Sequence, residues 1–188
     1  IIALLMLQPH FSASMVIITI VAVMMILAGC KFWHFLATGG AVGIPGMIGL
    51  IILEPYRLAR VTTFLDPWKD ATGTGWQVIQ SLYAIGSGGL FGAGLGESKQ
   101  KYLYIPEPHN DFIFSVLAEE LGFVGCVLVI VLFAIFIWRG VLIAMKSPDM
   151  FGSLIAIGIT TMVAIQVILN IAVVTSSVPA TGMPLPFF

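Results

Sequence analysis

Charged side chains are scarce in this sequence. Only 9% of its 188 residues are Asp, Glu, Lys or Arg, and 59% are hydrophobic, whereas soluble domains carry about 25% charged residues. No charged side chain occurs in 1–30, 32–53, 121–138 or 150–188. Because about 20 apolar residues suffice for a helix to cross a bilayer, the scarcity argues against an ordinary soluble domain and predicts a membrane protein. The lack of a basic stripe predicts no nucleic-acid partner.

Metal-ligating and nucleotide-binding patterns are also lacking. Cys30 and Cys126 both lie in apolar segments, which suits small apolar fillers. The three histidines show no metal-ligand spacing. The glycine-rich stretch 86–96 lacks the Gly-Lys-Ser/Thr of a P-loop, and no strand precedes it. We predict that these glycines serve backbone turns with positive φ instead.

The apolar stretches predict an all-α fold, a polytopic bundle of transmembrane helices. We expect the end of a helix at 1–7 and about four complete spans, at 12–30, 33–53, 111–138 and 151–175. The chain then divides into transmembrane helices at 1–53, one large loop at 54–110, transmembrane helices at 111–175 and the start of a truncated segment at 176–188. Because it begins inside an apolar run and stops without a polar tail, we expect a fragment that lacks both ends.

Cations in the short turns predict the orientation. Lys31 lies between the first two spans, and Arg139 and Lys146 flank the turn between the last two. By the positive-inside rule both turns face the cytoplasm, so the loop 54–110 faces outward. Within that loop, 76–85 has apolar residues at helical spacing but is too short to span. We expect an interfacial or re-entrant helix there.

Three carboxylates lie where the loop meets the third span. We expect Asn110 to cap the helix and Asp111 to lie in its first turn, where the helix dipole stabilises a carboxylate. The alternative is that Asp111 is a general base at the membrane surface. Glu119 and Glu120 lie two turns further along, and intramembrane charges usually mark a working site. At about 100° per residue, Glu119 can line the cavity of Asp111, whereas Glu120 faces away and is expected to pair with another helix.

The loop also carries cations, for which the sequence leaves two possible roles open. They could hold an anionic substrate, such as a pyrophosphate leaving group, or anchor the loop to lipid headgroups. These cations are Arg57, Arg60, Lys99 and Lys101.

Several motifs resemble those of the SEDS proteins (shape, elongation, division and sporulation). They are the runs 80–89, 106–114, 118–122 and 181–187, which read QSLYAIGSGG, PEPHNDFIF, AEELG and TGMPLPF. The runs 56–68 and 94–101 resemble the FtsW and SpoVE branch more closely than the RodA branch. His10 stands where that family usually has Asp, and the consequence of this departure is open.

The resemblance implies a bundle of about ten transmembrane helices and a peptidoglycan glycosyltransferase that joins lipid II units. It implies Asp111 as general base, with Glu107 also catalytic. The residues expected to contact the substrate are Arg57, Arg60, Lys101, Gln80, Ser81, His109 and Glu119.

The resemblance also implies a location and partners. We expect a multi-pass protein of the bacterial cytoplasmic (inner) membrane that works with a class B penicillin-binding protein in the divisome or the sporulation machinery. No cofactor is certain, but a divalent cation, Mg²⁺ or Mn²⁺, suits a carboxylate site. A lipid II flippase, a non-catalytic scaffold for cell-wall enzymes and a secondary transporter stay open as alternatives.

Overall fold

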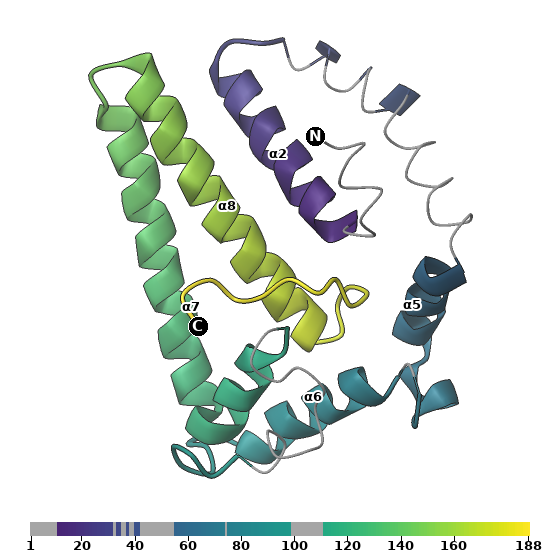
Figure 1. The fold of residues 1–188 in the computed structure, drawn as a ribbon. Helices are drawn as coiled ribbons and strands as arrows, with labels where there is room; N and C mark the ends of the chain where they lie inside the picture. The colour runs from purple at the N-terminus through teal and green to yellow at the C-terminus, as the bar shows by residue number, and fades with distance from the viewer. Residues whose placement is uncertain are drawn as a thin grey trace.

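The computed structural model describes residues 11–31, 33, 34, 37, 40, 41, 55–73, 75–98 and 111–188. Across these residues the regular structure is helical, with no strand, in agreement with the all-α prediction. Figure 1 shows the helices α2 (Phe11–Leu27), α5 (Pro55–Leu65), α6 (Trp76–Gly88), α7 (Ile113–Lys146) and α8 (Met150–Val174), with a short 3₁₀ turn, η2 (Pro67–Asp70), before α6. The predicted helix end at 1–7 and most of the predicted span 33–53 lie outside the described residues.

Helices α7 and α8 form an antiparallel pair that is long enough to cross a membrane. They contain 34 and 25 residues, and both are apolar over a membrane-length window. The helix that contains the predicted third span continues past 138, to Lys146. Ser147 has an extended backbone before Pro148, and a residue that precedes proline disfavours the helical region. Asp149 then caps α8 by accepting a hydrogen bond from the Gly152 amide at 2.7 Å.

Small residues bring these helices close together. A Cβ built at Gly140 of α7 would lie 2.2 Å from the Thr160 hydroxyl of α8, so only glycine permits this approach. The α2 helix packs on the other side of α8, where Gly158 faces the sulfur of Met24. Close approach at small residues is the usual basis of helix association in lipid, where burial of apolar side chains gains little.

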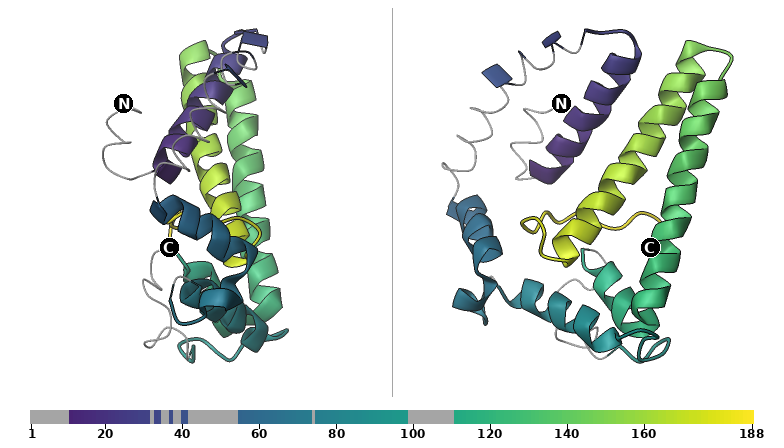
Figure 2. Two further views of the ribbon diagram at one scale, coloured as in Figure 1. Left: turned by 90° about the vertical axis from the view of Figure 1, so that its right-hand side faces the viewer. Right: turned by 180° about the vertical axis from the view of Figure 1, so that it is seen from behind.

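The α6 helix lies across one end of the α7–α8 pair, and the short turns lie at the other end. Figure 1 shows α6 at the bottom, whereas the turn from α7 to α8 and the end of α2 lie at the top. The view from behind in Figure 2 agrees. The 13 residues of α6 bury one face, including Val78, Ile79 and Ala84. The structure thus contains the short helix predicted at 76–85, and it lies crosswise, as an interfacial helix would.

The α7 helix is broken at Gly122. The φ of 67° and ψ of −168° at this residue belong to a region that only glycine adopts readily. In an unbroken helix the amides of Phe123 and Val124 would donate to the carbonyls of Glu119 and Glu120. Both bonds are replaced here, and the chain changes direction between 113–121 and 123–146 (Figure 1).

The turn that follows α6, residues 89–94, replaces the missing bonds of α7, and we call it the inserted turn. The carbonyls of Gly89 and Leu90 accept from the two amides after the break, at 2.9 and 3.1 Å. The amides of Ala93 and Gly94 donate to the two carbonyls before the break, also at 2.9 and 3.1 Å. Four bonds to the inserted turn therefore satisfy the backbone groups of the broken helix, as a membrane interior requires.

The glycine-rich stretch makes this contact possible. The prediction of positive φ is confirmed at Gly89, Gly92, Gly94 and Gly96. A Cβ at Gly92 would lie 2.1 Å from the carbonyl oxygen of Glu120, so a side chain there would push the inserted turn out of the break.

Candidate active site

The chain leaves α8 as an extended strap, residues 176–188, that crosses the bundle (yellow in Figure 1). Leu185 is 2% exposed and belongs to the same apolar core as Phe112 and Val174. At the end of the strap, Phe187 stacks on Phe133 of α7, with ring centroids 6.4 Å apart. These contacts fix the strap against the long helices.

Four consecutive strap residues, 180–183, contact four different parts of the molecule. The carbonyl of Ala180 accepts from the Arg60 guanidinium of α5 at 2.8 Å. The carbonyl of Thr181 accepts from Ser12 of α2. A Cβ at Gly182 would lie 3.5 Å from a carboxylate oxygen of Asp111. The carbonyl of Met183 accepts from Asn170 of α8 at 2.8 Å. The strap therefore brings Asp111 into one site with the helices around it.

Asp111 lies in the turn that leads into α7 and not inside the helix. The N-cap is Phe112, and no acidic residue lies in the first turn, so the prediction that Asp111 lies in the first turn was wrong. Asn110, the predicted cap, lies outside the described residues. Phe112 is 1% exposed, and burial of its ring sets where the helix begins. This placement weakens the interpretation that Asp111 serves only to stabilise the helix dipole. Because Asp111 lies before the helix, the angle of about 100° per residue no longer relates its direction to that of Glu119. The carboxylate of Asp111 instead faces the strap.

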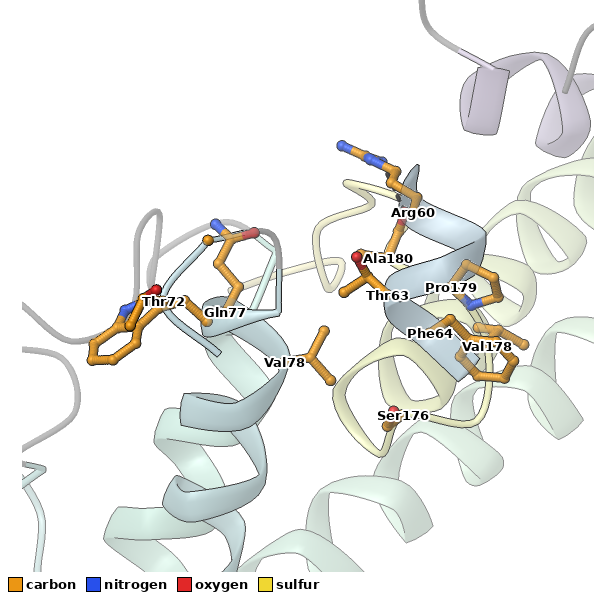
Figure 3. Close-up of a pocket in the computed structure, with 12 residues that line it drawn as sticks. Arg60, Thr63, Phe64, Thr72, Gln77, Val78, Ser176, Val178, Pro179 and Ala180 are labelled. Atoms are coloured by element: carbon orange, nitrogen blue, oxygen red, sulfur yellow. Dashed lines mark hydrogen bonds between the residues drawn. The ribbon is translucent and has the colours of Figure 1, made fainter. Parts of the chain in front are cut away.

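A pocket of about 400 Å³ is lined by residues of α5, α6 and the strap. Figure 3 shows α5 on one side, the first turn of α6 on another and strap residues along a third. Its lining is mixed in chemistry: the Arg60 cation, the hydroxyls of Thr63 and Thr72, the amide of Gln77 and the ring of Trp76. Cations bind phosphate, and hydroxyl, amide and aromatic groups together suit a sugar. Ala180 lines the pocket, and Gly182, two residues further along the strap, lies against Asp111.

Glu119 lies near the break in α7 and is buried, with 4% of its surface exposed. Its carboxyl accepts a hydrogen bond of 2.5 Å from the hydroxyl of Ser98, which is itself 1% exposed. Glu120 is partly exposed, and its carbonyl accepts from the inserted turn. The structure therefore connects Glu119 to the segment that follows the inserted turn.

We expect Ser98→Ala to lower the stability of the protein, because the buried Glu119 carboxyl loses one hydrogen-bond donor. A hydrogen bond contributes about 0.5–1.5 kcal/mol to stability, and more when its acceptor is charged. Thermal unfolding in detergent would measure the effect. Ser87→Ala is the matched control, since Ser87 is exposed and its hydroxyl donates only to the nearby Ala84 carbonyl. Equal losses for the two variants would show that the Ser98 bond contributes nothing.

The remaining predicted residues are placed as follows. Ser81 is fully buried, and its hydroxyl donates to the Val174 carbonyl at 2.9 Å and lies 3.0 Å from the Ser115 hydroxyl. Gln80 is buried beside it, with 6% of its surface exposed. Both therefore lie inside the packing between α6, α7 and α8. The Arg57 backbone is part of α5, whereas Lys99, Lys101, Glu107 and His109 lie outside the described residues.

Sequence reasoning missed Asn170. It is 1% exposed, and it donates both to the carbonyl of Met183 and to the carbonyl of Asp111, at 2.8 and 2.9 Å. The signal was available, because an amide within an apolar, membrane-length helix is costly and usually has a partner in the protein.

The predicted divalent cation stays a prediction. Among the described residues, no three His, Cys, Asp or Glu side chains lie close enough together to hold a metal ion, and Glu107 and His109 lie outside the described residues. We derive no step through a cation.

The long apolar helices, with a pocket of mixed chemistry at one end of their bundle, are those of a helical membrane protein. All 188 residues match the family model described as "Cell cycle protein", which groups FtsW, RodA and SpoVE. The chain belongs to this family.

Individual relatives agree with the family. The chain is 50% identical to the stage V sporulation protein E of Bacillus subtilis, over 98% of this chain and 50% of that protein. It is 45% identical to a probable peptidoglycan glycosyltransferase FtsW of Trichlorobacter lovleyi, over 98% and 48%. The chain thus spans about half the length of the curated relatives it matches.

A solved structure supports the fold. It is described as "Structural coordination of polymerization and crosslinking by a peptidoglycan synthase complex". The TM-score is 0.75 at 34% identity, and the match covers 98% of this chain and 51% of that one. The overall fold of this chain is therefore similar to that of about half of a chain in that complex.

Proposed function

We propose that the protein containing this chain is a peptidoglycan glycosyltransferase that polymerises lipid II into glycan strands during division or sporulation. One observation carries the proposal: a carboxylate, Asp111, lies against Gly182 of the strap, and the neighbouring strap residues Pro179 and Ala180 line a pocket together with the Arg60 cation. Its relatives are named as a probable glycosyltransferase of this kind and as a sporulation protein.

The chemistry needs a base and stabilisation of a leaving group. Asp111 accepts the proton of the acceptor sugar's 4-hydroxyl as that oxygen attacks the anomeric carbon of the lipid-linked donor. The bond from that carbon to the pyrophosphate oxygen breaks, and the lipid pyrophosphate leaves with the electron pair. Arg60 borders the pocket, and Arg57 and Lys101 are the further cations that could stabilise the leaving charge. A second protein carboxylate, Glu107, is expected to assist.

The direct test uses purified lipid II and the protein at its full natural length, reconstituted in membranes. A glycosyltransferase forms glycan chains without any other enzyme. A flippase would move lipid II between leaflets and form none, and a scaffold would do neither. Absence of chains from well-folded protein, with and without the expected partner, would contradict the proposal.

The proposed location is the bacterial cytoplasmic membrane, crossed several times, with 54–110 outside. The two short turns lie at one end of the bundle and α6 lies at the other (Figure 2), as this topology requires. We propose a cross-linking transpeptidase, a class B penicillin-binding protein, as the partner, because the similar solved structure is a complex for polymerisation and crosslinking.

A cysteine-labelling experiment tests the orientation. After replacement of Cys30 and Cys126, Thr72→Cys should react with an impermeant thiol reagent added to intact cells, and Lys146→Cys should react only after lysis. Both positions are exposed, so accessibility within the protein does not limit either reaction. The physical reason is the retention of Lys and Arg in short turns on the cytoplasmic side. The reverse labelling pattern would place Asp111 on the wrong side of the membrane for lipid II polymerisation.

A further inference from the structure

Asn170 is the one long polar side chain that joins the Asp111 turn to the strap among the described residues. It lies near the end of α8 and is 1% exposed. Its Nδ2 lies 2.9 Å from the carbonyl oxygen of Asp111 and 2.8 Å from that of Met183. These two carbonyls are far apart in sequence, and both N–H bonds of the amide are used to hold them together.

The chemistry of the partners fixes the orientation of the amide. Carbonyl oxygens only accept hydrogen bonds, so the nitrogen of the Asn170 side chain must face them and the oxygen must face away. That oxygen, Oδ1, is buried and has no hydrogen-bond partner among the described residues. The hydroxyl of Thr181, on the strap, is buried and unpaired as well within the part of the chain that the structure describes.

An unpaired buried oxygen is unfavourable, and buried polar atoms normally have partners. An apolar side chain of similar size would fill the same space without leaving this oxygen unpaired. What the amide contributes, and an apolar residue would not, is the pair of donors to Asp111 and Met183. The contact between Gly182 and the Asp111 carboxylate depends on the same alignment of turn and strap.

We propose that Asn170 is a positioning residue for Asp111. Its two hydrogen bonds fix where the Asp111 carboxylate lies relative to the acceptor hydroxyl. The inference rests on the proposed glycosyltransferase function. Asn170 touches neither substrate nor reacting atoms in this role. It acts by fixing the backbone on both sides of the carboxylate, and a displacement of about 1 Å in such a group can slow a reaction a hundredfold.

The test replaces Asn170 with Leu, which keeps the number and branching of the side-chain heavy atoms and removes both donors. Asn170→Leu should lower kcat for glycan-chain formation by about tenfold to a hundredfold, while KM for lipid II changes by less than about threefold. Thr160→Val is the matched control on the same helix, because its buried hydroxyl donates only to the Ala156 carbonyl one turn earlier. The control should keep kcat. A kcat loss in Asn170→Leu no larger than in the control, or a change confined to KM, would overturn the proposal.

A double-mutant cycle separates this inference from the function on which it rests. With enough enzyme to measure the residual rate, Asn170→Leu should cause less than about a twofold further loss in an Asp111→Asn background, because residues that act as one unit are not additive. Losses that multiply would refute the positioning role and leave the function intact. Near-normal chain formation by Asp111→Asn alone would instead refute the proposed function.

Discussion

Replacing Asp111 with Asn in the full-length protein should slow glycan-chain formation from purified lipid II by about a hundredfold or more. A general base contributes typically 10²–10⁴-fold to a rate, which is roughly 3–5 kcal/mol of barrier. The substitution is nearly isosteric. It leaves the main-chain carbonyl of Asp111, which accepts from Asn170, so the turn and the strap should stay joined. The variant should therefore fold normally and form glycan chains slowly.

The alternative role of Asp111, stabilisation of the helix end, predicts a different result. If the carboxylate only interacts with the start of α7, its loss costs about 0.3–1 kcal/mol of stability and leaves the rate nearly unchanged. Thermal unfolding and chain formation should therefore be measured on the same sample. Asp149→Asn is a matched control, because Asp149 caps α8 at the opposite end of the bundle and Asn caps helices equally well. A well-folded Asp111→Asn enzyme with near-normal activity would favour the flippase or the scaffold.

The second large effect is expected at Gly92 in the inserted turn. Gly92→Ala places a Cβ 2.1 Å from the Glu120 carbonyl oxygen, which is part of the rigid backbone before the break in α7. The turn must move, and the four hydrogen bonds that complete α7 are strained or lost together. We expect Gly92→Ala to lower the free energy of unfolding by at least about 3 kcal/mol and to reduce the yield of folded, detergent-soluble protein. Overpacking alone costs about 1–3 kcal/mol, and the buried amides and carbonyls would then also be left unpaired.

Gly96→Ala is the control that separates the clash from the cost of positive φ. Gly92 and Gly96 have nearly the same φ, +80° and +83°, but a Cβ at Gly96 meets nothing within 4 Å. The left-handed backbone alone costs a non-glycine residue roughly 1–2 kcal/mol, so Gly96→Ala should lose only that much. Thermal unfolding and yield after membrane extraction would compare the two variants. Losses of similar size would mean that the inserted turn does not support α7.

Local patterns in the sequence predicted part of the site. The charges of the loop singled out Asp111 and Arg60, and the glycine-rich stretch correctly predicted positive φ at Gly92 and Gly96. What failed was the placement of Asp111 in a first turn, because burial of the Phe112 ring against the core sets where the helix begins. Helix-end rules consider only neighbours in sequence, and this boundary depends on side chains of α8 and the strap.

The break in α7 could not be predicted from periodicity. The stretch 121–138 is apolar throughout, and Gly122 alone is compatible with a continuous helix. The break is stable because another segment supplies the replacement hydrogen bonds, and that pairing joins residues about thirty positions apart by the tertiary fold. The same holds for Asn170, whose importance appears only when the strap folds back to meet the Asp111 turn.

The sequence by itself determined that this is a helical membrane protein, because a chain with so few charges and such long apolar stretches is stable only where lipid replaces water and each helix satisfies its own backbone. Its motifs also predicted the family. Only the tertiary structure decided which polar groups share one site. Contacts between the strap, α5, α8 and the Asp111 turn join residues from opposite ends of the chain. Such contacts depend on how close-packed helices and turns meet in space, which no local pattern of residues specifies.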